Sequence, residues 1–381
     1  MKKYKLIFGV CGIGRGHIYR QLPIISYFAK TSKIAIFAFG ESYIFYKDFF
    51  VNNSNVKIFL VVVPWIHGGD VGINYQKTSS EPFNKENNFI SQNFATMEKA
   101  YKFFAGKPDL VVSDYEPVSA QYSYSLNVPL ITIDQQSKYF YDGYPDQLDN
   151  LSSVEERARL NLFFPKADMR IACSFFQPPS NKITYGDFKI TIMPPVIRND
   201  VAKLKTTEHE LPDRVLVYLS PYSSFVQNAS EVLTILAKFP KHSFHFFVSR
   251  ESDFKKIKQQ LPKNIKVNFH GDREFFDVLR SAGSAICTAG HTFISEMMFL
   301  NKPVYAIPLQ TYEQKYNAKV IEDNEFGISR HKIDFESLRY FLAGIAKFEH
   351  NIAINKNILL NKELGQVRII DLIEKMLSLS F

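Results

Sequence analysis

The chain has 381 residues, of which 46% are hydrophobic, and its formal net charge is +8 at pH 7. Because one domain usually holds about 100–200 residues, this length predicts two domains. No apolar run reaches the ~18 residues of a membrane-spanning helix, and the three cysteines form no C-x-x-C pair, which argues against a zinc site or a disulfide framework. The positive charge is spread over both halves and favours attraction to anionic small molecules or an anionic membrane over a nucleic-acid groove. We therefore expect a cytoplasmic protein that binds no nucleic acid.

The N-terminal segment has the pattern of a strand, a glycine turn and a helix. Residues 5–10 are apolar, three glycines alternate over residues 12–16, and apolar residues then repeat with helical spacing over about residues 18–30. The glycines depart from the dinucleotide fingerprint G-x-G-x-x-G, and Glu41 does not match the strand-terminal acid expected about 20 residues further on. The turn therefore argues against a dinucleotide and places His17 at the start of a helix.

His17 and Asp114 are the candidates for proton transfer. An imidazole with its ordinary pKa of about 6.5 is a free base at neutral pH, provided that a carboxylate holds its tautomer. Asp114 ends the strand predicted over residues 108–114, at the carboxyl edge where open α/β sheets bind ligands. The same carboxylate is also placed to cap a helix over residues 117–125, and the two roles are compatible.

Three further segments of the first half carry polar or aromatic candidates. A glycine-rich stretch over residues 64–72 contains the only tryptophan, Trp65, and offers His67 with Asp70 as a second base pair. Residues 74–93 are polar without clear periodicity and predict a mobile loop that reorders on ligand binding. Gln135 follows a strand predicted over residues 128–133 and lies in another loop at the ligand-binding edge.

The strand, turn and helix pattern starts again in the second half, after a proline-stiffened segment over residues 191–198. A strand over residues 214–219 leads into a hydroxyl-rich turn that holds Ser220 and Ser223. A strand over residues 265–269 leads into His270. Serines are common in turns of any kind, so these positions alone do not indicate a ligand.

Residues 282–318 carry the densest set of chemical signals. Gly290 joins a short strand over residues 285–287 to a helix predicted to begin near Phe293. Such a junction directs backbone N–H groups and the positive end of the helix dipole at one point, which suits a phosphate. Glu296 lies six residues after Gly290, where a carboxylate can accept hydrogen bonds from ribose hydroxyls. A further strand over residues 304–308 then leads to a loop with Glu313 and Gln314.

The spacing of Gly290, Glu296, Glu313 and Gln314 resembles the donor-nucleotide signature of inverting GT-B glycosyltransferases. These include the plant and bacterial UDP-glycosyltransferases and the peptidoglycan N-acetylglucosaminyltransferase. In those families a Gly precedes a ribose-binding Glu by six residues, and an acidic residue with Gln contacts the donor sugar. The plant signature has His and Trp where this chain has Thr288 and His291.

The opening glycine turn is similar to the first loop of the same families. There the His at the position of His17 is the general base, and an Asp at a strand end, matched here by Asp114, orients it. The Pro that commonly follows three residues after this His is replaced by Arg20.

The resemblance implies catalytic roles for His17 and Asp114. It implies donor contacts from residues of the second half: Ser220, Ser223, Phe269, His270, Thr288, Gly290, His291, Thr292, Glu296, Glu313 and Gln314. Acceptor-side positions come from the first half: Gly14, Arg15, Gly16, Trp65, His67 and Gln135. No Asp-x-Asp motif is present, so we expect no metal and no cofactor, only a nucleotide-sugar cosubstrate with UDP as the family's usual nucleotide.

The implied fold class is α/β, of GT-B type, with two Rossmann-like doubly wound domains facing an interdomain cleft. Residues 1–198 would bind the acceptor, with the last helix, about residues 366–381, packed on them, and residues 199–365 would bind the donor. The expected reaction is metal-independent, inverting sugar transfer from a UDP-sugar to a hydroxyl of a cell-envelope glycan or glycolipid. Peripheral contact with an anionic membrane, at the inner face of the cytoplasmic membrane, is also expected. Two alternatives are a nucleotide-sugar epimerase or hydrolase of the same fold and a non-enzymatic basic scaffold or nucleic-acid-binding protein.

Overall fold

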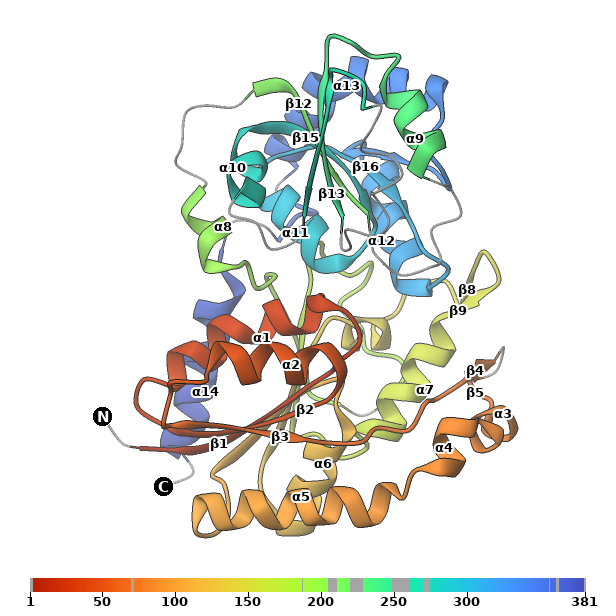
Figure 1. Ribbon diagram of the computed structural model, residues 1–381. Helices are drawn as coiled ribbons and strands as arrows, with labels where there is room; N and C mark the ends of the chain where they lie inside the picture. Colours follow the sequence, from red (N-terminus) through yellow and green to blue (C-terminus); the bar gives the residue numbers. More distant parts are fainter. Residues whose placement is uncertain are drawn as a thin grey trace. The chain divides into compact units, whose positions relative to one another are not determined.

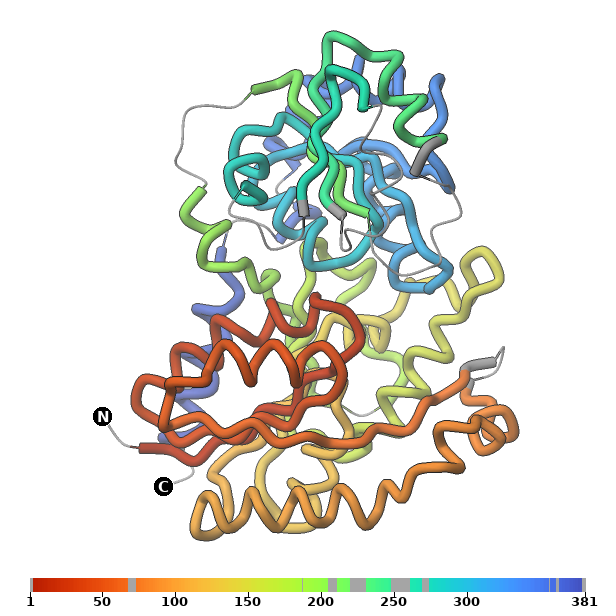
Figure 2. The backbone as a smooth tube through the Cα atoms, in the orientation of Figure 1, coloured from red at the N-terminus to blue at the C-terminus, as the bar shows by residue number. Residues whose placement is uncertain are grey.

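The computed structural model of the protein describes residues 3–69, 72–186, 188–204, 211–219, 229–248, 261–269, 274–355, 357–360 and 363–379 (Figure 1). They belong to two compact units, one formed by residues 1–198 with 363–381 and the other by residues 199–362. The first unit therefore combines both ends of the chain (Figure 2). Each unit is described by itself.

The first unit is built on a seven-stranded parallel sheet in the order β11-β10-β7-β6-β1-β2-β3. Its strands are β1 (Lys5–Val10), β2 (Lys33–Ala38), β3 (Val56–Leu60), β6 (Leu110–Asp114), β7 (Leu130–Asp134), β10 (Met169–Cys173) and β11 (Ile190–Met193). The strand order reverses direction between β1 and β6. At such a switch point the loops diverge and leave a crevice at the carboxyl edge of the sheet.

Helices cover both faces of this sheet (Figure 1). The first face packs against α1 (Arg15–Phe28), α2 (Gly40–Phe49) and α14 (Gly365–Leu379), which share one hydrophobic core with the strands. The other face carries α5 (Phe89–Phe104) and α6 (Pro117–Leu126), and Phe37 of β2 contacts Tyr122 of α6. Smaller elements complete the unit: β4 (Gly68–Gly69), β5 (Gly72–Ile73), α3 (Tyr75–Ser80), α4 (Pro82–Glu86), η1 (Ser137–Phe140), β8 (Gln147–Leu148), β9 (Leu151–Ser152) and α7 (Ser153–Phe163).

The last helix is fixed to the first unit by side-chain and backbone contacts. Gln366 accepts a hydrogen bond from the backbone N–H of Ile197 and donates one to its carbonyl oxygen, at 3.1 and 2.7 Å. A Cβ on Gly365 would lie 2.0 Å from the carbonyl oxygen of Pro194. Glycine is therefore required where this helix begins, because any side chain would collide with the backbone of residues 194 and 195.

The prediction of a loop over residues 74–93 is wrong, because this stretch contains α3, α4 and the start of α5. Asn74 and Asn88 are the N-caps of α3 and α5, and their side chains accept hydrogen bonds from the backbone N–H groups of Lys77 and Ser91. Such caps stabilise a helix start in an otherwise polar sequence. Most side chains here are exposed, so the periodic apolar pattern by which helices are usually recognised is weak.

The second unit repeats this architecture with a six-stranded parallel sheet in the order β14-β13-β12-β15-β16-β17. The strands are β12 (Leu211–Tyr218), β13 (Ser243–Val248), β14 (Ile265–Phe269), β15 (Ala282–Thr288), β16 (Val304–Ile307) and β17 (Gly327–Ser329). The order again reverses beside the first strand, between β12 and β15. The two sheets confirm the predicted α/β class with two Rossmann-like, doubly wound parallel sheets.

Helices also lie on both faces of the second sheet. One face shares a core with α9 (Ala229–Leu236) and α13 (Phe335–Ile354). The remaining helices are α8 (Asn199–Leu204), α10 (Glu274–Ser281), α11 (His291–Phe299) and α12 (Tyr312–Asp323). The start of α11 at His291 lies two residues before the predicted start.

A buried lysine closes the C-terminal end of α10. The Nζ of Lys302 donates hydrogen bonds to the carbonyl oxygens of Leu279, Arg280 and Ala282, at 2.9, 2.7 and 2.6 Å, and its residue is 2% exposed. The last carbonyls of a helix have no partner within it, and a cation at this end interacts favourably with the helix dipole. Lys302 thereby ties the loop before β16 to the end of α10.

We expect Lys302→Met to destabilise the second unit by about 2–3 kcal/mol, because three buried carbonyl oxygens lose their donor. Lys319→Met is the matched control, since Lys319 is exposed and pairs with Asp323 four residues later; its cost should stay below about 0.5 kcal/mol. Urea unfolding followed by circular dichroism measures both variants. Equal stability of the two variants would contradict the role of Lys302.

Candidate active site

His17 lies where β1 gives way to α1, beside the switch point of the first sheet. The N-cap of α1 is Gly14, whose φ of 76° is in the left-handed region that favours glycine. A Cβ on Gly12 would lie 1.8 Å from the carbonyl oxygen of Phe39. Two of the three glycines of the turn are thus required by the backbone, and the turn that they form delivers His17 to the carboxyl edge of the sheet.

Asp114 ends β6, the strand next to β1, and is completely buried. Its Oδ1 lies 2.8 Å from Nδ1 of His17 and accepts a hydrogen bond from Nη2 of Arg20 at 2.7 Å. Its Oδ2 accepts hydrogen bonds from Nε of Arg20 at 2.8 Å and from Nε2 of Gln21 at 3.0 Å. The carboxylate is therefore held by three side chains of the first turns of α1, and His17 is one of them.

The charges around His17 change its pKa. Burial lowers the pKa, but electrostatic and hydrogen-bond interactions with Cys11 and with the Asp114 carboxylate outweigh burial and raise it from 6.5 to about 10. The side chain is 16% exposed. Because Nδ1 faces Asp114, Nε2 is the ring nitrogen that would exchange a proton with a substrate. With a pKa of about 10 the ring carries its extra proton at neutral pH, contrary to the free base expected from the ordinary pKa, and the neutral, basic form is favoured only at alkaline pH.

Two residues that follow Asp114 complete the turn. Tyr115 has a φ of 56°, a strained conformation for a residue with a side chain, and its ring centroid lies 6.2 Å from that of His17. Glu116 is the N-cap of α6 and accepts hydrogen bonds from the N–H groups of Val118 and Ser119. The alternative reading of Asp114 as this cap is therefore wrong. Burial raises the pKa of Glu116 to about 7.

The other predicted acceptor-side residues make local contacts in the first unit. Arg15 is exposed and pairs with Glu41 at 3.6 Å. Trp65 is 51% exposed and hydrogen bonds through its backbone to Asn84. His67 Nε2 lies 2.7 Å from Oε2 of Glu81. Gly16 lies in the first turn of α1. Gln135 is buried, and its Oε1 accepts a hydrogen bond from Lys138 Nζ at 2.8 Å.

In the second unit, Gly290 lies between α11 and β15, the strand beside β12 at the switch point of that sheet. It is the N-cap of α11 without a capping side chain, and its backbone conformation, with φ −67° and ψ 134°, is open to any residue. A Cβ added to Gly290 would meet no atom within 4 Å. Neither packing nor backbone geometry requires a glycine here. Open space thus lies in front of a helix N-terminus, an arrangement that suits an anion.

The neighbours of Gly290 are held in place from α12 and within α11. Asn317 Nδ2 donates to the carbonyl oxygen of Ala289 at 3.0 Å, while its Oδ1 is buried without a hydrogen-bond partner. Ser295 Oγ donates to the carbonyl oxygen of His291 at 2.7 Å. The predicted donor residues of α11 and β15 are placed around this turn: Thr288, His291 and Glu296 are buried, and Thr292 is half-buried.

Glu313 and Gln314 lie in the first turn of α12, so the prediction of a loop at these two residues is wrong. Thr311 is the N-cap of this helix and accepts a hydrogen bond from the backbone N–H of Gln314 at 3.3 Å. The Oε1 of Gln314 accepts from the N–H of Leu309 at 3.0 Å. Its carbonyl oxygen is thus occupied within the loop, which leaves its amide nitrogen and the carboxylate of Glu313 to contact a ligand.

Some predicted positions cannot be compared with the structure. Ser220, Ser223, His270 and Asp70 lie outside the described residues, and of Phe269 only its place at the end of β14 is described. The described residues hold no group of three or more His, Cys, Asp or Glu side chains that could bind a metal ion. Within the same part of the chain, every helix is too short or too polar to cross a membrane.

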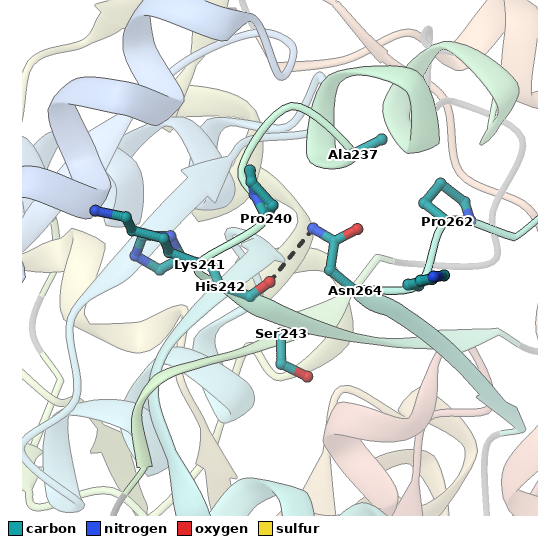
Figure 3. A pocket seen from close by; sticks show the side chains of 8 residues that line it. Ala237, Pro240, Lys241, His242, Ser243, Pro262 and Asn264 are labelled. Atoms are coloured by element: carbon teal, nitrogen blue, oxygen red, sulfur yellow. Dashed lines mark hydrogen bonds between the residues drawn. The ribbon is translucent and has the colours of Figure 1, made fainter.

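A cavity of about 530 Å³ lies in the second unit, at the amino edge of the sheet (Figure 3). Its walls come from the segments that precede β13 and β14, and Asn264 Nδ2 donates to the carbonyl oxygens of Leu236, Phe239 and His242. Ligands of open α/β sheets bind at the opposite, carboxyl edge. We therefore assign the cavity no part in the candidate site.

Sequence reasoning did not identify the contacts of Arg20, Gln21 and Glu116. In the sequence, Arg20 stands out only as the replacement for a Pro. Its spacing of three residues from His17 on a predicted helix indicates that the two side chains lie on one helix face. The capping role of Glu116 had a signal as well, since Pro117 directly after it is typical of the first helical position.

Comparisons with known proteins agree with the fold. Residues 4–346 match the family described as "Glycosyl transferase family 1". The solved structures that resemble the chain include the calicheamicin glycosyltransferase CalG4, with 16% identity, a TM-score of 0.66 and 99% of each chain covered. A UDP-glucosyltransferase from Polygonum tinctorium has 13% identity, a TM-score of 0.67 and 99% of each chain covered. MurG of Acinetobacter baumannii has 14% identity and a TM-score of 0.60, covering 98% of this chain and 100% of its own.

No curated protein sequence matches the chain. The family match nevertheless spans most of it, and the structural likeness extends over nearly its full length. The chain belongs to glycosyl transferase family 1 and is a glycosyltransferase with the GT-B fold.

Proposed function

We propose that the protein transfers a sugar, with inversion, from a UDP-sugar to a hydroxyl group of a glycan or glycolipid of the cell envelope. The observation that carries this proposal is the buried pair of His17 and Asp114 at the switch point of the first sheet, with Nδ1 and Oδ1 2.8 Å apart. A carboxylate that fixes one ring nitrogen directs the other to a substrate, which is the arrangement of a general base.

The proposed reaction is a single displacement. Nε2 of His17 takes the proton of the acceptor hydroxyl while its oxygen attacks the anomeric carbon of the donor sugar. The bond from that carbon to the diphosphate oxygen breaks, and the electron pair leaves with the diphosphate. The N-terminus of α11 at Gly290 stabilises the charge that develops there, and Glu296, Glu313 and Gln314 bind the ribose and the sugar. We expect no metal or further cofactor to take part.

We expect His17→Ala to lower kcat/KM for transfer by about 10²- to 10⁴-fold, because the general base is removed. Binding of UDP, measured by calorimetry, should stay unchanged. His350→Ala is the matched control, since His350 is an exposed residue of α13, and it should keep full activity. The assay separates sugar transferred to an acceptor from free sugar and from an epimer of the donor. Equal turnover by His17→Ala, or products formed from the donor alone, would contradict the proposal.

Gly290→Ala tests the donor half. The added methyl group fits the protein, because no atom lies within 4 Å of it, but it enters the space that we assign to the diphosphate. We expect the Kd for UDP to rise by about tenfold or more, equivalent to ~1.4 kcal/mol. The free energy of unfolding should change by less than about 1 kcal/mol, because alanine restricts the unfolded chain but is less favourable than glycine at an N-cap.

A thermal-shift panel of nucleotide-sugars provides the measurement for the wild type and for Gly290→Ala. A ligand at 100 times its Kd stabilises the folded protein by about 2.7 kcal/mol, so UDP-sugars should stand out in the wild type. Unchanged affinity in the variant would remove Gly290 from the donor site. A larger stabilisation by sugars linked to another nucleotide would contradict UDP as the donor nucleotide.

Exposed apolar side chains on α5 support contact with a membrane or a lipid-linked acceptor. Ile90, Phe94 and Tyr101 are 86%, 62% and 44% exposed, and their spacing of four and seven residues places them on one helix face. Lys99 and Lys102 are exposed on the same helix. Apolar side chains with nearby lysines are typical of helices that bind an anionic bilayer surface.

We expect Phe94→Glu to reduce co-sedimentation of the protein with vesicles that contain phosphatidylglycerol by about fivefold or more. The aromatic ring that would enter the bilayer is replaced by a negative charge, which the anionic lipid surface repels. Leu162→Glu is the matched control, as Leu162 is 43% exposed on α7 and gives the same charge change. Failure of the wild type to sediment with these vesicles would rule out the proposed membrane contact.

A further inference from the structure

Arg20 holds the carboxylate that orients the candidate base. Its Nε and Nη2 donate to the two oxygens of Asp114 at 2.8 and 2.7 Å, in the paired geometry that a guanidinium forms with a carboxylate. Its residue is 4% exposed. Asp114 is completely buried, so this contact is shielded from water on both sides. In the resembling families a Pro commonly stands at this position, and a Pro side chain has no group that could donate these bonds.

The same guanidinium also lies against the imidazole of His17. Arg20 Nη2 is 2.9 Å from Nδ1 of His17. A guanidinium has no lone pair to accept a hydrogen bond, so it repels a second positive charge at this distance. Arg20 therefore acts on the ring in two opposite ways: it fixes the carboxylate that favours the imidazolium form, and its own charge opposes that form.

The pKa of Asp114 agrees in direction with its contact to Arg20. Burial raises the pKa of Asp114, but the charges of Arg20 and His17 outweigh burial and lower it to about 2. Asp114 is thus ionised at any pH at which the enzyme would work. The charged or titratable groups around His17 and Arg20 come from several elements: Cys11 after β1, Asp114 and Tyr115 at the end of β6, Asp134 at the end of β7, Cys173 at the end of β10 and Tyr46 of α2.

We propose that Arg20 is a positioning residue that fixes the Asp114 carboxylate and limits the protonation of His17, so that this base works nearer to neutral pH than Asp114 alone would allow. The proposal rests on the proposed function for its catalytic meaning. Its structural meaning, the control of the His17 charge by Arg20, does not depend on the identity of donor or acceptor.

The test compares Arg20→Met, Arg20→Gln and Arg20→Lys with the wild type over a range of pH. Without the cation, the negative charge of Asp114 acts on His17 undiminished. We expect the acid limb of kcat/KM to move to higher pH by about one unit or more in the Met and Gln variants, with an approximately tenfold loss of kcat/KM at pH 7.5. Arg20→Lys should restore most of this activity, because it retains the charge.

Arg157→Met is the control for a purely structural effect. Arg157 is also buried, and its guanidinium donates hydrogen bonds to Ser153, the first residue of α7, and to Asp146. It should lose stability without moving the pH midpoint. If Arg20→Met does not fold, as judged by circular dichroism, Arg20→Gln carries the comparison, since its amide can still donate to Asp114.

A second readout separates this inference from the proposed function. The nitrogen chemical shifts of the His17 ring, followed by NMR in the protein without substrate, report the His17 pKa directly. A higher midpoint in the folded Met or Gln variant, but not in Arg157→Met, supports the inference even if no sugar transfer is found. An unchanged midpoint in the folded variant overturns it, whatever the activity of the wild type.

Discussion

The buried charge of Asp114 is the constraint on which the candidate site of the first unit depends. A carboxylate removed from water is stable only when hydrogen bonds and opposite charge replace its hydration. Here the replacements come from His17, Arg20 and Gln21, all within the first turns of α1. The position of α1 relative to β6 is therefore set by one ionic cluster, and the orientation of the His17 ring follows from the same cluster.

The two units share a strand order, and this order explains where their polar residues gather. In each sheet the first strand lies between two neighbours, and the chain connections on its two sides run to opposite faces of the sheet. Side chains at the carboxyl end of the first strand are therefore not covered by a crossover helix. In the first unit His17 follows the first strand, β1, and Asp114 ends its neighbour β6. In the second unit the turn at Gly290 follows β15, the neighbour of the first strand β12. The same topological feature thus brings the candidate base to the switch point in one unit and the candidate anion-binding turn to it in the other.

Sequence patterns predicted the elements that have strong local signals and missed those set by tertiary contacts. The strands before His17, after residue 108 and before Gly290 are short apolar runs, and the structure has strands at each. The paired contact of Arg20 with Asp114 joins residues 94 positions apart, and no local pattern specifies it. The helices over residues 75–86 differ from the prediction for another reason: their side chains are exposed, so they lack an apolar period, and only α3 begins with an Asn cap.

The two candidate half-sites differ in how their polar groups are satisfied, and this difference has a physical reason. A general base must keep one orientation through every turnover, so internal hydrogen bonds to Asp114 fix His17 before any substrate arrives. A donor site must instead release its product, and an anion bound too completely by the protein would leave slowly. At α11 the N-cap is a glycine that offers no side chain as an acceptor, so a bound diphosphate would itself serve as the cap.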